Sequence, residues 1–219
     1  MAVKVGLKFI EKWNESIENR IFLYEKETVE KGQIVFYGPS NFTRWRREDH
    51  GNVPLREAVL GKSGKQCCIN RGFGSSCTEH HLYYYPRVVR PLEPKVLVYA
   101  PGLGNATGFG YTPEEVWNLG QRVMEYAWAD FPELKIYLCG LNLYRDRNKP
   151  NYDVKAQYEG WLREYAENTP NCFFVDTANY KPLQRDDIYV ADGVHYNNLG
   201  YEIYGEFFRE VLADELAKY

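Results

Sequence analysis

Apolar residues recur at helical spacing within the first 28 residues of the chain. They stand three and four positions apart, with Lys, Glu and Asn between them: Phe9, Ile10, Trp13, Ile17, Ile21 and Tyr24. This spacing predicts an amphipathic N-terminal helix over residues 1–28. Its apolar face can pack on the chain's own sheet or across a dimer, so the sequence leaves the oligomeric state open.

Five short apolar runs further along predict strands at residues 34–37, 67–70, 95–100, 134–140 and 172–177. The run at 95–100 is almost continuous, which is typical of a strand buried on both faces. Helical patterns alternate with these runs, at residues 78–94 with an interruption at Pro86, 112–129, 152–167 and 198–219. The start at Thr112 is well marked, because a cap hydroxyl is followed by Pro113 and two acids.

Alternating strands and helices predict an α/β fold in which a parallel sheet of about five strands is covered on both faces. The length of 219 residues suits one domain, residues 1–219. In such sheets, ligands bind at the carboxyl ends of the strands. We therefore expect Ser40, the 70–76 loop and the 101–108 loop to converge there.

Ser40 follows the first strand at a sharp break, Gly38-Pro39-Ser40, and could be a helix cap or a nucleophile. Near the other end of the chain, Asp192 and His195 stand three residues apart, just ahead of the last helix. A carboxylate that close can orient the imidazole, and the imidazole can then take a proton from a hydroxyl. These residues predict a Ser–His–Asp triad for nucleophilic catalysis.

A triad needs hydrogen-bond donors for the oxyanion that forms when serine attacks a carbonyl group. Three sources follow strands in this sequence. They are the backbone N–H of Ser40, an N–H in the glycine-rich turn at residues 72–75, and the side-chain amide of Asn105.

With these residues in place, the chain resembles the SGNH hydrolases, the GDSL-type esterases and lipases. Four blocks match in the order of that family: "YGPSNFTRW", "NRGFGSS", "GLGNATG" and "DGVHYNNLGY". The resemblance implies a flavodoxin-like three-layer α/β/α sandwich, with Ser40, Asp192 and His195 as the catalytic residues. It assigns the oxyanion hole to Ser40, Ser75 or the neighbouring Gly74, and Asn105. It implies no metal and no other cofactor.

Several positions depart from the family pattern. Pro39 replaces the acid before the serine, and Ala106 replaces the acid after the asparagine, so two acids that buttress the family's site are missing. Ser75 stands where the second block ends in glycine, and we expect its N–H to serve as a donor only if its φ is negative. These losses support an alternative, a weakened enzyme or a non-catalytic binding module for an acylated small molecule or glycan.

Charge and apolar content limit the classes of partner that this chain is expected to bind. The net charge of −3 and the pI of about 5.9 give no sign of a polyanion partner, which argues against nucleic acid. No apolar run is long enough for a membrane span or a signal peptide, and the odd number of cysteines favours a reducing compartment. We predict a cytoplasmic hydrolase of small-molecule or glycan esters. The absence of a long apolar lid favours short acyl groups such as acetyl.

Other motifs favour structural roles. The two Gly-x-Gly sequences at 72–74 and 102–104 lack the third glycine of a dinucleotide fingerprint. The spacing of the cysteines and histidines at 67–81 matches no common zinc site, so we expect the cysteines as core thiols and His80 and His81 on a polar helix face. The arginines at 44, 46 and 47 are expected in a solvated first helical turn, with substrate steering as the alternative. The tyrosines at 83–85 and Tyr144 are expected in packed positions or in an acyl or sugar pocket.

Overall fold

The computed structural model describes residues 15–49, 51–145 and 152–219. Five strands form one parallel sheet: β1 (Ile34–Gly38), β2 (Cys68–Gly72), β3 (Val96–Tyr99), β4 (Lys135–Cys139) and β5 (Cys172–Val175). Their order is β2-β1-β3-β4-β5, and every neighbouring pair is parallel. This confirms the predicted α/β sandwich with a five-stranded parallel sheet.

The helices are α2 (Glu15–Lys26), α3 (Ser40–Thr43), α4 (Leu55–Ala58), α5 (Thr78–Val88), α6 (Gly104–Gly108), α7 (Pro113–Asp130), α8 (Tyr152–Glu167), α9 (Asn198–Val211) and α10 (Ala213–Leu216). Two short 3-10 helices, η1 (Arg90–Leu92) and η2 (Lys181–Leu183), complete the described elements. Within these residues, no helix combines the length and the apolar character needed to cross a bilayer.

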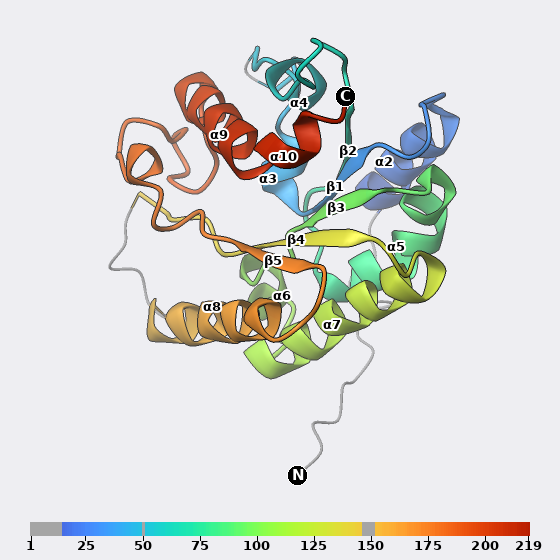
Figure 1. Cartoon of the computed structure of the whole chain (residues 1–219). Coiled ribbons are helices and arrows are strands. Elements are labelled where there is room, and N and C mark those ends of the chain that lie inside the picture. The colour runs from blue at the N-terminus through green and yellow to red at the C-terminus, as the bar shows by residue number, and fades with distance from the viewer. Residues whose placement is uncertain (1–14, 50, 146–151) are drawn as a thin grey trace.

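Side chains that alternate along each strand build two cores, one on each face of the sheet. Val35, Tyr37, Leu97 and Tyr99 point into the core formed with α2, α5, α7 and α8. Their neighbours in β1 and β3 point into the opposite core with α3, α4, α9 and α10. Figure 1 shows α7 and α8 on one side of the sheet and α9 and α10 on the other. All five cysteines are buried free thiols.

The described part of the predicted N-terminal helix is α2, which buries Ile17, Ile21 and Tyr24. These side chains belong to the core on the α5 and α7 face, so this part of the helix packs on the chain's own sheet. The prediction for residues 1–14 falls outside the described residues.

Two predicted helices have different limits in the structure. Helix α5 continues through Pro86 to Val88 because its last turn is held by packing: Tyr84, Tyr85 and Val88 are all buried. The predicted closing helix breaks at Leu212, whose φ of −100° and ψ of 13° start the separate helix α10. The break buries Leu212 and Leu216 in the core below. In both places tertiary packing outweighed the local pattern.

The strand order determines where a ligand cleft can form. Chain connections leave β1 and β3 in opposite directions along the sheet, toward β2 and toward β4. Between two such strands, the loops at their carboxyl ends diverge and leave a crevice. Ser40 follows β1, and the loop that leads into α6 follows β3. The fold therefore brings the two predicted site segments to the same crevice.

Candidate active site

Ser40 is the first residue of the short helix α3, directly after β1. The turn is tight, because a Cβ on Gly38 would lie 2.9 Å from both the Cβ and the carbonyl oxygen of Ala100. Pro39 stands at the cap position and makes no side-chain capping bond. The Ser40 hydroxyl is instead 2.7 Å from Nε2 of His195. The alternative role of Ser40 as a helix cap is therefore wrong.

Asp192 holds His195 through both carboxylate oxygens. Oδ1 accepts hydrogen bonds from the backbone N–H groups of Val194 and His195 at 2.8 and 2.9 Å. Oδ2 lies 2.7 Å from Nδ1 of the His195 ring. The tight turn between them needs a left-handed residue, supplied by Gly193 at a φ of 68°. One carboxylate thus fixes both the backbone and the ring of the histidine.

These contacts set the charge state of the carboxylate. Desolvation by burial raises the pKa of Asp192, but the hydrogen bonds from the backbone and ring of His195 and from Val194 N–H outweigh it. The net effect holds the pKa well below its usual range, so Asp192 stays ionised. An ionised Asp192 favours a proton on Nδ1 of His195, which leaves Nε2 free to accept the Ser40 proton. Arg44 Nη1 lies 3.9 Å from Asp192 Oδ2 and adds a further positive charge.

The predicted oxyanion donors lie beside the serine. A Cβ built on Gly74 would be 3.8 Å from the Cβ of Ser40, so this turn borders the nucleophile. The condition set for Ser75 is not met, since its φ is 58°. A left-handed residue in a turn can, however, bring successive N–H groups to one side, as in anion-binding nests. The expectation for Ser75 is therefore not met as stated, and the residue carries the strain of a left-handed non-glycine position.

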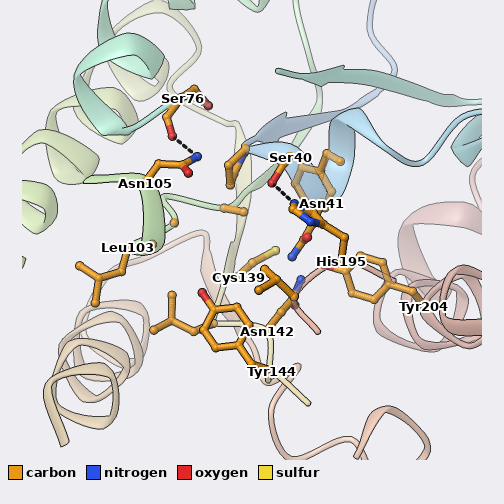
Figure 2. A pocket seen from close by; sticks show the side chains of 18 residues that line it. Ser40, Asn41, Ser76, Leu103, Asn105, Cys139, Asn142, Tyr144, His195 and Tyr204 are labelled. Carbon is orange, nitrogen blue, oxygen red and sulfur yellow. Dashed lines mark hydrogen bonds between the residues drawn. The ribbon is translucent and has the colours of Figure 1, made fainter. Parts of the chain in front are cut away.

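Asn105 lies in the first turn of α6. Its Nδ2 donates a hydrogen bond to the carbonyl oxygen of Ser76, 2.9 Å away, as Figure 2 shows. An amide nitrogen carries two hydrogens, so the second one remains available for an oxyanion. This contact ties the third strand's loop to the glycine-rich turn after β2.

A buried chain of hydrogen bonds supports that turn from behind. Ser76 Oγ donates to the carbonyl oxygen of Phe73 at 2.6 Å and lies 3.0 Å from His81 Nε2. Tyr99 OH lies 3.4 Å from His81 Nδ1. Burial lowers the pKa of His81 to about 3. The only hydrogen of the Ser76 hydroxyl is already donated to Phe73, so Ser76 Oγ must accept the hydrogen bond from His81 Nε2. A neutral imidazole donates from one nitrogen only, so Nδ1 accepts from the Tyr99 hydroxyl.

A cavity of about 300 Å³ opens in front of these groups. Ser40, Ser76, Asn105 and His195 line it together with apolar and amide side chains: Leu103, Leu141, Val194, Asn41 and Asn142. Figure 2 shows Ser40 and His195 facing one another across the dashed bond, with Tyr144 on a neighbouring wall. Tyr144 is thus a pocket residue. At positions 39 and 106, where the sequence blocks depart from the SGNH pattern, this chain has the apolar side chains of Pro39 and Ala106 in place of acids.

Other residues of interest lie elsewhere. Tyr84 and Tyr85 are packed in the core, and Tyr83 is exposed. The arginines are not in a helical turn, since α3 ends at Thr43; Arg44 approaches Asp192, and Arg46 and Arg47 line a different cleft. Among the described residues, no three His, Cys, Asp or Glu side chains gather as a metal ion would require.

Sequence reasoning missed the supporting role of Ser76 and His81. Ser76 was read only as part of the glycine-rich block, and His81 only as a zinc candidate. Their contact depends on the first turn of α5 folding back onto the turn after β2. The expectation that His80 and His81 lie on a polar helix face is wrong, because both side chains are fully buried.

Solved structures with the same fold include proteins named as a lipase, an acylhydrolase and an esterase. A GDSL-like lipase from Bacteroides thetaiotaomicron is 17% identical at a TM-score of 0.70, with 90% of this chain and 97% of that chain covered. A protein assigned as an acylhydrolase from Bacteroides fragilis is 19% identical at a TM-score of 0.72, over 93% and 99%. The acetyl xylan esterase AlAXEase is 19% identical at a TM-score of 0.67, over 82% and 98%.

No family model matches the sequence, and no curated protein is similar to it. At these low identities, the structural likeness shows the fold alone. The fold is that of the SGNH hydrolases, the class that the four sequence blocks resemble. The resemblance is confirmed at the level of the fold.

Proposed function

We propose that this protein is a serine hydrolase of carboxylic esters that forms an acyl-enzyme on Ser40. One observation carries the proposal: a continuous chain of contacts at 2.7 Å runs from Asp192 through His195 to Ser40, which is 155 residues away from the histidine. The structural neighbours, which are named as esterases, a lipase and acylhydrolases, add support.

In the proposed mechanism, Ser40 Oγ attacks the ester carbonyl carbon while His195 Nε2 takes the hydroxyl proton. Asp192 stabilises the imidazolium through Nδ1. The oxyanion accepts hydrogen bonds from the Ser40 N–H, from an amide of the Gly74–Ser75 turn and from Asn105 Nδ2. Collapse of the tetrahedral intermediate breaks the ester C–O bond, and His195 protonates the departing alcohol. Water then attacks the acyl-enzyme and gives a proton to His195. The bond between the acyl carbon and Ser40 Oγ breaks, the acid leaves, and His195 returns the proton to Ser40 Oγ.

The cavity favours short acyl groups, such as acetyl. Its volume of about 300 Å³ is at the lower end of the range for ligand pockets. Apolar lining comes from Leu103, Leu141 and Val194, while Asn41, Asn142 and Tyr144 offer hydrogen bonds. A small acyl group can use the apolar part, and a hydroxylated alcohol such as a sugar can use the polar part. One structural neighbour is named as an acetyl xylan esterase, which agrees with this substrate class.

The test is hydrolysis of para-nitrophenyl acetate, butyrate and a longer ester by the wild type and by Ser40→Ala. We expect the rate to fall with acyl length and to vanish in the variant. A methylsulfonyl or fluorophosphonate reagent should label the wild type once, at Ser40. Activity that rises with acyl length would refute the short-acyl proposal and leave the esterase standing.

The second candidate, a non-catalytic binding module, has support in the two replaced acids and in the strained Ser75. Equal background rates in the wild type and Ser40→Ala, with both proteins folded, would favour it. Binding of acetylated glycans without turnover would then identify its ligand. Chemical labelling of Ser40 distinguishes the esterase from the binding module. An activated serine reacts rapidly with the reagent, whereas the serine of a binding module reacts no faster than an ordinary hydroxyl group.

A further inference from the structure

A second cleft lies on the outer side of β2, the edge strand of the sheet. Helix α2 and the segment that follows α3 form its two walls, and its volume is about 450 Å³. No residue lines both this cleft and the cavity that contains Ser40. The proposed hydrolysis assigns no role to it.

Positive charge is concentrated in this cleft, although the chain as a whole is acidic. Its lining contains five arginines against two glutamates: Arg20, Arg46, Arg47, Arg56 and Arg71, with Glu27 and Glu48. Two of the arginines are neutralised by carboxylates. Arg71 Nη1 lies 2.6 Å from Glu27 Oε2, and Arg47 Nη2 lies 2.5 Å from Glu57 Oε2.

The other three arginines have no carboxylate at ion-pair distance within the described residues. Arg46 donates hydrogen bonds only to neutral groups, the Thr43 carbonyl oxygen and the hydroxyl of Tyr24. Arg20 lies over the Tyr24 ring at 5.9 Å. Burial lowers the pKa of Arg20, and the charge of Arg46 lowers it further, so the two guanidinium groups repel one another. The charges of Glu27 and Glu48 offset only part of this effect on the pKa. Arg56 is exposed at the rim.

Within the described part of the chain, the walls also hold buried N–H donors without a partner. Tyr24 is buried, and its hydroxyl hydrogen is already donated to the Gly72 carbonyl oxygen. Among the residues that the structure describes, the Nε of Arg71 and the Nε1 of Trp45, both in buried side chains, have no acceptor. The guanidinium groups of Arg20 and Arg46 lie close together in a partly buried site, which is unfavourable, and an anion that accepts hydrogen bonds from them relieves this repulsion.

We propose that this cleft binds a dianionic oxyanion, of the kind carried by phosphate and by small-molecule phosphomonoesters. Arg20, Arg46 and Arg56 supply three positive charges, and Glu48 offsets one of them, so a ligand charge of about −2 matches the remainder. Guanidinium groups bind tetrahedral oxyanions through paired N–H donors. The apolar walls of Leu55 and Ile69 leave room for an organic group beside the anion.

The proposal is tested by calorimetric titration of the full chain with inorganic phosphate, sulfate, acetate and phenyl phosphate at constant ionic strength. We expect saturable binding of phosphate and sulfate, and binding of the singly charged acetate that is about tenfold weaker or more. If phenyl phosphate binds more tightly than phosphate, its phenyl group contacts the apolar wall and the natural ligand is a phosphomonoester. If the two bind equally, the natural ligand is the free anion. Both results support an oxyanion site.

Arg20→Gln and Arg56→Gln should each weaken phosphate binding by about tenfold or more, since each removes a charge-assisted contact. Arg122→Gln, an exposed arginine on α7, is the matched control and should bind phosphate like the wild type. Arg46 is left intact because it bonds to the helix that carries Ser40. Thermal unfolding of each variant verifies that it is folded.

The proposal is overturned if the wild type shows no saturable binding of phosphate or sulfate. It is also overturned if Arg20→Gln and Arg56→Gln bind as the wild type and Arg122→Gln do, which is the behaviour of solvated surface arginines. The result is independent of ester hydrolysis: Ser40→Ala should bind phosphate with unchanged affinity, whether or not the wild type is an esterase.

Discussion

Gly72 lets the edge strand β2 pack directly against helix α3, the helix that presents Ser40. A Cβ at this position would lie 2.5 Å from the Cβ of Phe42 and 2.6 Å from the backbone nitrogen of Thr43. The φ of Gly72 lies outside the left-handed region, so alanine is allowed by the backbone. The substitution Gly72→Ala therefore tests contact between two elements without forcing a disallowed backbone conformation.

The size of the effect follows from these distances. Carbon atoms rest at about 3.5–4.0 Å, so helix α3 must move away from β2 by about 1 Å. Overpacking of this kind typically costs about 1–3 kcal/mol in the free energy of unfolding. A displacement of about 1 Å at a reacting group can lower the rate about 10²-fold. The hydroxyl of Ser40 would lose its 2.7 Å contact with His195.

Urea unfolding and para-nitrophenyl acetate hydrolysis measure the two effects in the same samples. Gly108→Ala is the matched control, because a Cβ there has no atom within 4 Å and its φ is also outside the left-handed region. That control should gain up to about 1 kcal/mol through the less flexible unfolded chain. The reasoning is refuted if Gly72→Ala is as stable and as active as Gly108→Ala.

Three further predictions concern the triad, the buried histidine and a helix cap. Asp192→Asn should lower ester hydrolysis by about 10⁴-fold, because the amide no longer favours the productive tautomer of His195; an activity close to the wild type would exclude the triad. Since burial lowers the pKa of His81 to about 3, the unfolded state binds more protons than the folded state as pH falls below about 6.5. The free energy of unfolding should therefore fall by about 1.4 kcal/mol per pH unit from this group, and urea titrations between pH 7.5 and 5 should show a shallower loss for His81→Gln; equal slopes would contradict the assignment. Thr112→Ala removes the cap bond to Glu115 N–H and should cost about 1 kcal/mol without a change in hydrolysis, whereas a loss of activity in the folded variant would show that α7 acts on the site.

The strands and the fold class could be predicted because each rests on short stretches of sequence. Residues 96–99 form a strand within the predicted 95–100, and α8 spans the predicted Tyr152–Glu167. The start of α7 follows from Thr112, Pro113 and Glu115, which form a capping box. Patterns of this kind act over one or two turns of chain, so the local sequence carries them.

Features that depend on packing were harder to predict. The continuation of α5 through Pro86 and the break at Leu212 follow from which side chains the core can bury. The left-handed φ of Ser75 could not be read from a serine, because the turn imposes it. The contact of His81 with Ser76 needs the start of α5 to fold back on the preceding turn.

The sequence by itself determined a parallel α/β sheet and nominated Ser40, Asp192, His195 and Asn105, since periodicity and residue type are local properties. Tertiary structure alone decided that these side chains meet, because the reversal of strand order between β1 and β3 opens the crevice into which their loops converge. It also decided the grouping of arginines beside β2, because only folding brings those of α2, α4 and β2 next to the arginines that follow α3. Distances between remote segments are set by the packing of the whole core, and no short stretch of sequence encodes them.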